Sequence, residues 1–317
     1  MTGARSTPLG KTDVLVSPIG VGAGAWAQAR WGYGATYGDR EITEAYQASI
    51  DAGLTLFDTA EVYGDGGSER LLGSLARGAR VVLATKISPT RAFFQRRLTH
   101  ASFRRALAAS LERLGTDRID LYQVHQPSWA PSIRSLMEWM ADAVRDGQIR
   151  AVGVCNYDAE QVRRAHEALG ARGVPLASNQ VEYSVLARAP ERNGVLAACR
   201  ELGVTVIAHS PLARGLLSGR YRPDAPPSDP RPMAPRELAA RLRDVEPVCR
   251  VLAGIGERRG GKSVAQVALN WLLQQPGVVP IPGAKNAAQA RANAGALGWS
   301  LGREDMAAVD EATLRYR

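Results

Sequence analysis

Short apolar runs alternate with amphipathic stretches along this chain, and this alternation constrains the fold more than any other feature. The amphipathic stretches, such as 40–53 and 132–147, have the periodicity of helices and often end in glycine, a common helix stop. Eight strand-like runs lie at 16–22, 54–60, 81–86, 119–125, 149–156, 176–183, 204–211 and 278–284. Repeated strand-then-helix units predict a parallel sheet with right-handed crossovers, and eight of them predict a closed (β/α)8 barrel.

An open doubly wound sheet is the alternative arrangement of the same units. A nucleotide-binding version should carry the motif GxGxxG after its first strand. The segment GVGAGAW supplies Gly20, Gly22 and Gly24, but Ala25 and Ala27 stand where the third glycine is needed. The incomplete motif favours the barrel.

Composition indicates a single domain over 1–317, because barrels of this length are ordinarily one domain and 45% of the 317 residues are hydrophobic. The start of the sequence lacks the apolar core of a secretory signal, and no apolar run approaches the roughly 20 residues of a membrane span. The three cysteines lack CxxC spacing, which is typical of free thiols. We therefore expect a cytoplasmic protein without membrane contact.

The net charge of +9 raises the question of a nucleic-acid partner. The positive residues are scattered, however, and the densest patch, 96–114, places its arginines where a helix would face solvent. We expect no nucleic-acid partner. One segment breaks the strand–helix rhythm: the proline-rich stretch 219–238, which predicts a long loop after the seventh strand, a lid, a binding loop or a disordered connection.

Polar side chains collect at the expected carboxyl ends of the strands, where barrel active sites lie. Each has an ordinary explanation, such as a turn cap, a packing tyrosine, a lysine leaving the core or a core histidine. None of these explanations accounts for so many polar residues being expected at the same rim of the barrel. The residues are Asp58, Tyr63, Lys86, His125, Asn156, Gln180, His209 and Ser210.

These residue types point to proton transfer at an oxygen. A nearby ammonium, Lys86, would lower the pKa of the Tyr63 phenol, and Asp58 would compensate the lysine charge. His125 could hold a substrate oxygen beside the phenol. No nucleophile with an adjacent base and no HxxxH or CxxC pair is present, so no metal is expected. Protonation of a carbonyl oxygen while a cofactor delivers hydride fits best.

Several motifs resemble those of the aldo-keto reductase superfamily, and they follow one another in the family's order. They are LGKTDVLVSPIGVGAGAW, FDTAEVYGDGGSERLLG, LATK, DLYQVHQP, GVCNY, NQVEYS, SPLARGLLSGRY and VVPIPGAKNAAQARANAGAL. The first resembles the family's amino-terminal β-hairpin and first barrel strand. By this resemblance the catalytic tetrad is Asp58, Tyr63, Lys86 and His125, with Tyr63 as the general acid in reduction.

The resemblance also implies an extended nicotinamide cofactor bound without a Rossmann fold. Asn156 and Gln180 match the residues that hold the carboxamide, and Trp26 matches an aromatic of the substrate pocket. The pyrophosphate loop matches Ser210, Pro211, Leu212, Gly215 and Arg220, and the adenosine end matches Gly283, Lys285, Gln289 and Asn293. Two cations, Arg220 and Lys285, would lie near a 2′-phosphate, which favours NADP(H) while NAD(H) stays possible.

Two positions depart from the family pattern. His209 stands where a tyrosine or tryptophan usually stacks on the nicotinamide ring; it either stacks as an imidazole or is a hydrogen-bonded core histidine. Ala292 replaces an acidic residue that often contacts adenine, which bears on adenine affinity but not on the tetrad.

Three functions are compatible with these motifs. The first is an NADPH-dependent reductase of an aldehyde or ketone, and the second is a sugar or polyol dehydrogenase running in the other direction. The third is a non-catalytic, cofactor-binding auxiliary protein, as the β subunits of potassium channels are. The partner is in each enzymatic case a small molecule, and we expect a monomer. Substrate choice would depend on the mouth loops 26–38, 127–131 and 219–238.

Overall fold

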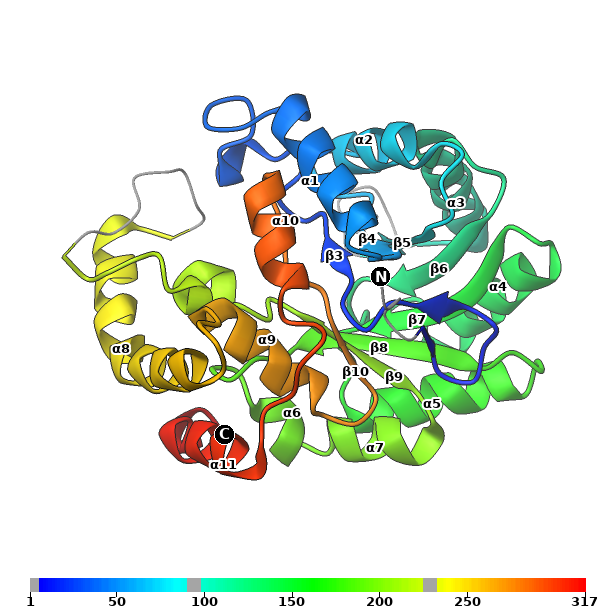
Figure 1. Ribbon diagram of the computed structural model, residues 1–317. Helices are drawn as coiled ribbons and strands as arrows, with labels where there is room; N and C mark the ends of the chain where they lie inside the picture. The colour runs from blue at the N-terminus through cyan, green and yellow to red at the C-terminus, as the bar shows by residue number, and fades with distance from the viewer. Residues whose placement is uncertain (1–5, 90–97, 225–232) are drawn as a thin grey trace.

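Eight parallel strands form one sheet in the computed structural model, which describes residues 6–89, 98–224 and 233–317. The strands are β3 (Val21–Gly22), β4 (Leu56–Asp58), β5 (Val82–Ile87), β6 (Ile119–Val124), β7 (Ile149–Cys155), β8 (Leu176–Glu182), β9 (Thr205–His209) and β10 (Val278–Pro280). They neighbour one another in chain order from β3 to β10. Figure 1 shows the strands surrounded by helices.

The sheet closes on itself between β3 and β10. Gly22 forms a parallel bridge with Gly283, and its N–H donates to the carbonyl of Pro282 at 3.1 Å. A Cβ atom on Gly22 would lie 2.8 Å from the Ile281 carbonyl oxygen, so only glycine lets the two backbones approach this closely. The predicted (β/α)8 barrel is confirmed, and the open doubly wound sheet is excluded.

Helices follow the strands on the outside of the barrel. They are α1 (Asp39–Asp51), α2 (Gly67–Ala76), α3 (His100–Leu114), α4 (Ile133–Arg145), α5 (Ala159–Gly170), α6 (Ala189–Arg192), α7 (Val195–Leu202), α8 (Pro235–Arg258), α9 (Val264–Leu273), α10 (Ala287–Ala294) and α11 (Arg303–Ala312). Short 3₁₀ helices are η1 (Ala29–Trp31), η3 (Ala213–Ser218) and η4 (Leu314–Tyr316). Local sequence explains several ends: Asp158 caps α5 by accepting from the Gln161 N–H at 2.8 Å, and α3 ends at Gly115 in the left-handed conformation.

The predicted amino-terminal hairpin is also confirmed, and it packs against the interior of the barrel. Its strands β1 (Thr7–Pro8) and β2 (Leu15–Val16) pair antiparallel. Side chains of this segment join a core cluster with inward-facing residues of the barrel: Leu9, Val14, Val16, Leu56, Val82, Ala84, Leu121, Ala151, Ala177, Ile207, Val279 and Ile281. The Gly10 N–H also donates to the Thr205 hydroxyl at 2.7 Å, at the start of β9. The hairpin thus lies at the amino-terminal ends of the strands and leaves the carboxyl ends accessible.

Two expected boundaries differ in the structure. The first strand was expected over 16–22, but Val16 pairs with Thr7 in the hairpin, and only Val21–Gly22 enters the barrel. The intervening Pro18 cannot donate a ladder hydrogen bond, which explains the break. The proline-rich connection ends sooner than expected, because α8 begins at Pro235. Its central part, 225–232, lies outside the described residues.

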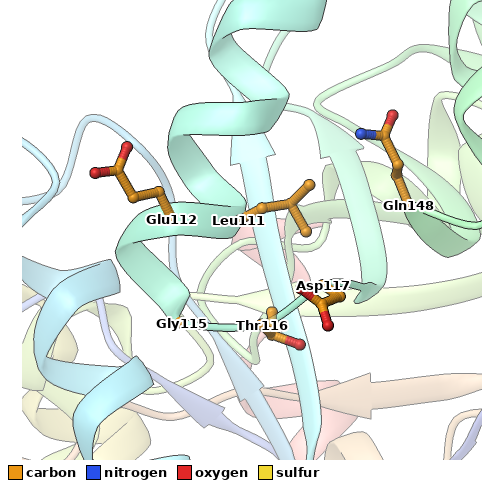
Figure 2. Close-up of a pocket in the computed structure, with 6 residues that line it drawn as sticks. All are labelled: Leu111, Glu112, Gly115, Thr116, Asp117 and Gln148. Carbon is orange, nitrogen blue, oxygen red and sulfur yellow. The ribbon is translucent and has the colours of Figure 1, made fainter.

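A hollow of about 410 Å³ lies at the amino-terminal ends of the barrel strands, opposite the predicted site (Figure 2). It is lined by Leu111, Glu112, Gly115, Thr116, Asp117 and Gln148. These residues belong to the end of α3 and the segments that precede β6 and β7. The hollow contains no predicted site residue. Across the described part of the chain, no helix is both long and apolar enough to cross a membrane.

Candidate active site

A buried ion pair lies at the carboxyl ends of β4 and β5. The Lys86 ammonium donates to Asp58 Oδ1 and, at 2.8 Å, to the Thr59 carbonyl. All six residues of β5 are buried, so Lys86 has 0% of its surface exposed and its charge depends on these partners. Burial alone would lower the pKa of Lys86, but Asp58 and Tyr63 more than offset this and raise it. The lysine therefore carries its positive charge inside the barrel.

Two glutamines complete the surroundings of Asp58. The side-chain amide nitrogens of Gln123, on β6, and Gln180, on β8, each donate to Asp58 Oδ2 at 2.9 Å. The Gln180 nitrogen also lies 3.1 Å from Gln123 Oε1. Gln180 was predicted to hold a cofactor carboxamide, and here its nitrogen points at the ion pair. Gln123 was missed by the sequence argument, although an inward-facing amide within the run IDLYQVH was a visible signal.

Tyr63 follows β4 in a glycine-containing turn that is tightly packed. A Cβ atom on Gly64, whose φ is +57°, would lie 2.2 Å from the Ala27 carbonyl oxygen, so this turn needs glycine. The Lys86 nitrogen lies 5.3 Å from the centre of the Tyr63 ring. Burial raises the pKa of Tyr63 and Lys86 opposes the rise, so the net shift is upward. Lys86 was expected to lower the pKa of Tyr63, but desolvation outweighs the effect of the lysine charge.

His125 joins the group from the end of β6. Its backbone N–H donates to the Ile87 carbonyl at 2.8 Å, and its ring meets the Tyr63 ring edge-on, with centroids 5.7 Å apart. Burial, followed by the charge of Lys86, lowers the pKa of His125 to about 3, so the imidazole is neutral near pH 7. All four members of the predicted tetrad therefore lie together, as a cationic lysine, a carboxylate, a protonated phenol and a neutral imidazole.

Asn156, His209 and Ser210 lie beside this group at the ends of β7 and β9. Asn156 Nδ2 lies 3.3 Å from both the His125 carbonyl oxygen and Cys155 Sγ. The two ring nitrogens of His209 lie 3.2 Å from Asn156 Oδ1 and Ser210 Oγ. Burial, with a further contribution from Lys86, lowers the pKa of His209 to about 4. Burial also raises the pKa of Cys155 to about 12, so this thiol stays protonated.

The loop after β9 has an unusual backbone. Ser210, Ala213 and Arg214 have positive φ without being glycine, and Gly215 has a φ of +97°. Successive turns are closed by the Ala213 N–H on the Ser210 carbonyl at 2.8 Å and the Gly215 N–H on the Leu212 carbonyl at 2.9 Å. Pro211 is buried, Leu212 is half-buried, and Arg220 is exposed just beyond η3. Successive residues with positive φ are the backbone geometry of anion-binding nests, although the N–H groups of Ala213 and Gly215 are bonded within this loop.

The predicted adenosine-end residues lie around the start of α10. Gln289 accepts from the Lys285 N–H at 2.9 Å, and Asn293 donates to the Gly283 carbonyl at 3.1 Å. The Lys285 ammonium donates to the Trp31 carbonyl at 2.7 Å and lies 5.5 Å and 5.0 Å from the centres of the Trp31 and Tyr37 rings. The structure thus links Lys285 to the loop before α1, a contact that the sequence argument did not foresee.

Trp26, which the resemblance assigns to the substrate pocket, is enclosed by other side chains in the structure. Its side chain is fully buried, its indole N–H donates to the Ala284 carbonyl at 2.9 Å, and its ring contacts Phe57. Trp26 therefore belongs to the buried core cluster, next to the carboxyl end of β4. Within the described residues there is also no cluster of three or more histidine, cysteine, aspartate or glutamate side chains that could hold a metal ion.

Comparisons with known proteins identify the family of this chain. A model of the aldo/keto reductase family matches residues 18–313. The chain is 38% identical over 314 residues to a chloroplastic pyridoxal reductase of Arabidopsis thaliana, covering 94% of this chain and 83% of that protein. It is 33% identical over 311 residues to the aldo-keto reductase YhdN of Bacillus subtilis, covering 94% and 90%.

A solved structure is similar as well. An aldo-keto reductase from Klebsiella pneumoniae in complex with NADPH matches with a TM-score of 0.74 at 31% identity, covering 95% of this chain and 94% of that one. The family model spans almost the whole barrel, and the relatives align along nearly their full length. The chain therefore belongs to the aldo/keto reductase family.

Proposed function

We propose that this protein is an NADPH-dependent reductase that converts an aldehyde or ketone to the alcohol, with Tyr63 as the general acid. Family membership makes the chain an oxidoreductase. The observation that carries the finer proposal is the grouping of Tyr63, Lys86 and His125 around one point at the rim of the barrel. A protonated phenol beside a fixed cation is suited to an oxygen that gains negative charge.

The residues present fit the cofactor. Asn156 offers a side-chain amide next to the tetrad. The turns at 210–215, with their positive φ angles, suit a pyrophosphate. Lys285 adds a cation just before the start of α10. Lys285 and Arg220 favour the additional phosphate of NADP(H) over NAD(H). The Klebsiella pneumoniae neighbour was solved with NADPH, which supports this choice.

When bound, NADPH supplies the hydride that reduces the carbonyl carbon. The Tyr63 hydroxyl gives its proton to the carbonyl oxygen, so one hydride and one proton add across the C=O bond. Lys86 stabilises the phenolate that Tyr63 becomes, and Asp58 keeps Lys86 charged and fixed. A neutral His125 can donate a hydrogen bond to the same oxygen and hold it beside the phenol.

The substrate class is an aldehyde or ketone. The relative from Arabidopsis thaliana is named for pyridoxal, an aromatic aldehyde, and this makes pyridoxal a sensible first compound for an aldehyde panel. A reductase should consume NADPH with several aldehydes, which is followed directly by absorbance.

The variant Tyr63→Phe tests the acid role. It removes the hydroxyl but keeps the ring, so we expect kcat to fall by at least about 100-fold while the Kd for NADPH stays within about twofold. The Kd is measured by quenching of tryptophan fluorescence. A Tyr63→Phe enzyme with near wild-type kcat on a good aldehyde would show that another group supplies the proton.

A further inference from the structure

His209 connects two neighbours through both of its ring nitrogens. Nε2 lies 3.2 Å from Asn156 Oδ1, and Nδ1 lies 3.2 Å from Ser210 Oγ. The three residues come from the ends of β7 and β9, and the register of β8 with β9 places His209 opposite Glu182. Asn156 is itself anchored, because its backbone N–H donates to the Gln180 carbonyl at 2.7 Å. A chain of hydrogen bonds therefore runs from Ser210 through His209 to Asn156.

The direction of this chain follows from one fixed group. The His125 backbone carbonyl can only accept, so the Asn156 side-chain atom 3.3 Å from it must be the nitrogen. The oxygen of the same amide then faces His209, and Nε2 must carry the proton in order to donate to it. A neutral imidazole with its proton on Nε2 has a lone pair on Nδ1, and the Ser210 hydroxyl donates to that lone pair.

We propose that His209 is a positioning residue: together with the His125 carbonyl, and supported by Ser210, it holds the Asn156 amide in one orientation, so that the amide offers a fixed donor and a fixed acceptor to the nicotinamide carboxamide. The inference rests on the proposed function, since only there does Asn156 meet a carboxamide. A tyrosine or tryptophan at this position, as the family resemblance leads us to expect, could stack on the nicotinamide but could not make this pair of hydrogen bonds.

The surroundings of His209 support the neutral form that this chain requires. Burial, then the positive charge of Lys86, disfavours the imidazolium, and Arg214 acts in the same direction, whereas Asp58 opposes them. At neutral pH His209 therefore donates through one nitrogen and accepts through the other. A histidine has a smaller ring than tryptophan, but at this position it contributes two hydrogen bonds in addition to any stacking.

The tautomer can be observed in the unliganded protein. The chain has four histidines, so ¹⁵N-histidine labelling gives few signals, and the His209 signal is the one lost in His209→Gln. A two-bond ¹H–¹⁵N correlation spectrum near pH 7 should show His209 neutral with its proton on Nε2. A proton on Nδ1, or a cationic ring, would overturn the proposal. This result does not depend on whether the protein is a reductase.

A pair of variants separates hydrogen bonding from stacking. His209→Phe keeps a ring and loses both hydrogen bonds, whereas His209→Gln loses the ring and keeps an N–H that can donate to Asn156. We expect His209→Phe to weaken NADPH binding by about five- to tenfold, the value of one hydrogen bond, and His209→Gln to recover much of this loss. Binding of 2′,5′-ADP, which lacks the nicotinamide, should change less than about twofold in both variants.

The opposite order of affinities would contradict the inference. If His209→Phe binds NADPH as tightly as the wild type while His209→Gln binds weakly, the His209 ring contributes to NADPH affinity by stacking alone and not by its hydrogen bonds. Failure of the wild type to bind NADPH would instead contradict the proposed function and leave the tautomer result standing.

Discussion

Lys86 and Asp58 form an ion pair in which both side chains are almost fully buried, at the carboxyl ends of adjacent strands. Two buried charges of opposite sign tolerate each other because each compensates the other's lost hydration. The fold therefore depends on both members of the pair, and the Lys86 charge also acts on the nearby Tyr63 ring.

Lys86→Met should damage both roles. Activity is expected to fall by about 10²- to 10⁴-fold, because the phenolate left by Tyr63 loses its cation. The free energy of unfolding is expected to drop by about 3–5 kcal/mol, because Asp58 stays buried without a positive partner. The double variant Asp58→Asn/Lys86→Met should recover part of the stability but none of the activity. Urea denaturation and steady-state rates measure the two effects, and a double variant less stable than Lys86→Met would refute the argument.

Gln123→Leu tests the amide group that the sequence argument missed. Its nitrogen donates to Asp58 Oδ2 and its oxygen accepts from Gln180, so the apolar variant removes one of the two amide donors of Asp58 Oδ2 and one acceptor of the Gln180 nitrogen. We expect a loss of about 1–3 kcal/mol in the free energy of unfolding and a several-fold lower kcat. Gln148→Leu is the matched control, because the Gln148 oxygen is buried without a hydrogen bond in the structure and lies at the opposite end of the barrel. Equal losses in the two variants would show that Gln123 has no specific role.

The two buried histidines make stability depend on pH. Burial lowers the pKa of His125 to about 3 and that of His209 to about 4, below the ordinary value of 6.5. As pH falls below about 6.5 the unfolded chain takes up these protons and the folded chain does not, so acidification favours unfolding. Full stability is thus expected above about pH 6.5, with a loss from about pH 6.5 down to about pH 4 from His209 and down to about pH 3 from His125.

Urea denaturation of the unliganded protein near pH 7 and near pH 5 measures this loss. His209→Phe has one fewer titrating group, so its free energy of unfolding should decrease less between the two conditions than that of the wild type. If the two proteins lose the same amount, His209 is protonated to the same extent in the folded and unfolded states.

Much of the fold could be predicted because an apolar run in the sequence results directly from the burial of a strand in the barrel. Strands buried on both faces must be apolar along their length, and for this reason β5 and β6 lie within the expected runs 81–86 and 119–125 to within one residue. The tetrad was placed for a related reason: parallel strands in register bring the residues at their carboxyl ends to one rim. The hairpin boundary at Val16 was wrong, because an apolar run does not reveal where a strand changes its partner.

The parts of the site that the sequence did not reveal depend on contacts between distant segments. Lys285 and the Trp31 carbonyl are 254 positions apart, and nothing local to either one signals the contact. The burial of Trp26 follows from its partner Ala284, 258 positions away. The net pKa shift of Tyr63 depends on the balance of desolvation against one charge, which requires knowing how deeply the ring is buried.

Lys285→Met tests the source of the preference for NADPH over NADH. The ammonium lies among the Trp31 carbonyl and two aromatic rings, which hold it near the start of α10. Loss of this cation should weaken NADPH binding by about 10- to 100-fold, as expected for a charged hydrogen bond to a phosphate, and change NADH binding less than about threefold. Arg291→Met is the matched control, because Arg291 is an exposed cation on α10, the helix that follows Lys285. Fluorescence titration with both nucleotides gives the ratio of the two Kd values. If that ratio stays at the wild-type value in Lys285→Met, the discrimination comes from another cation, and Arg220→Met becomes the variant to measure next.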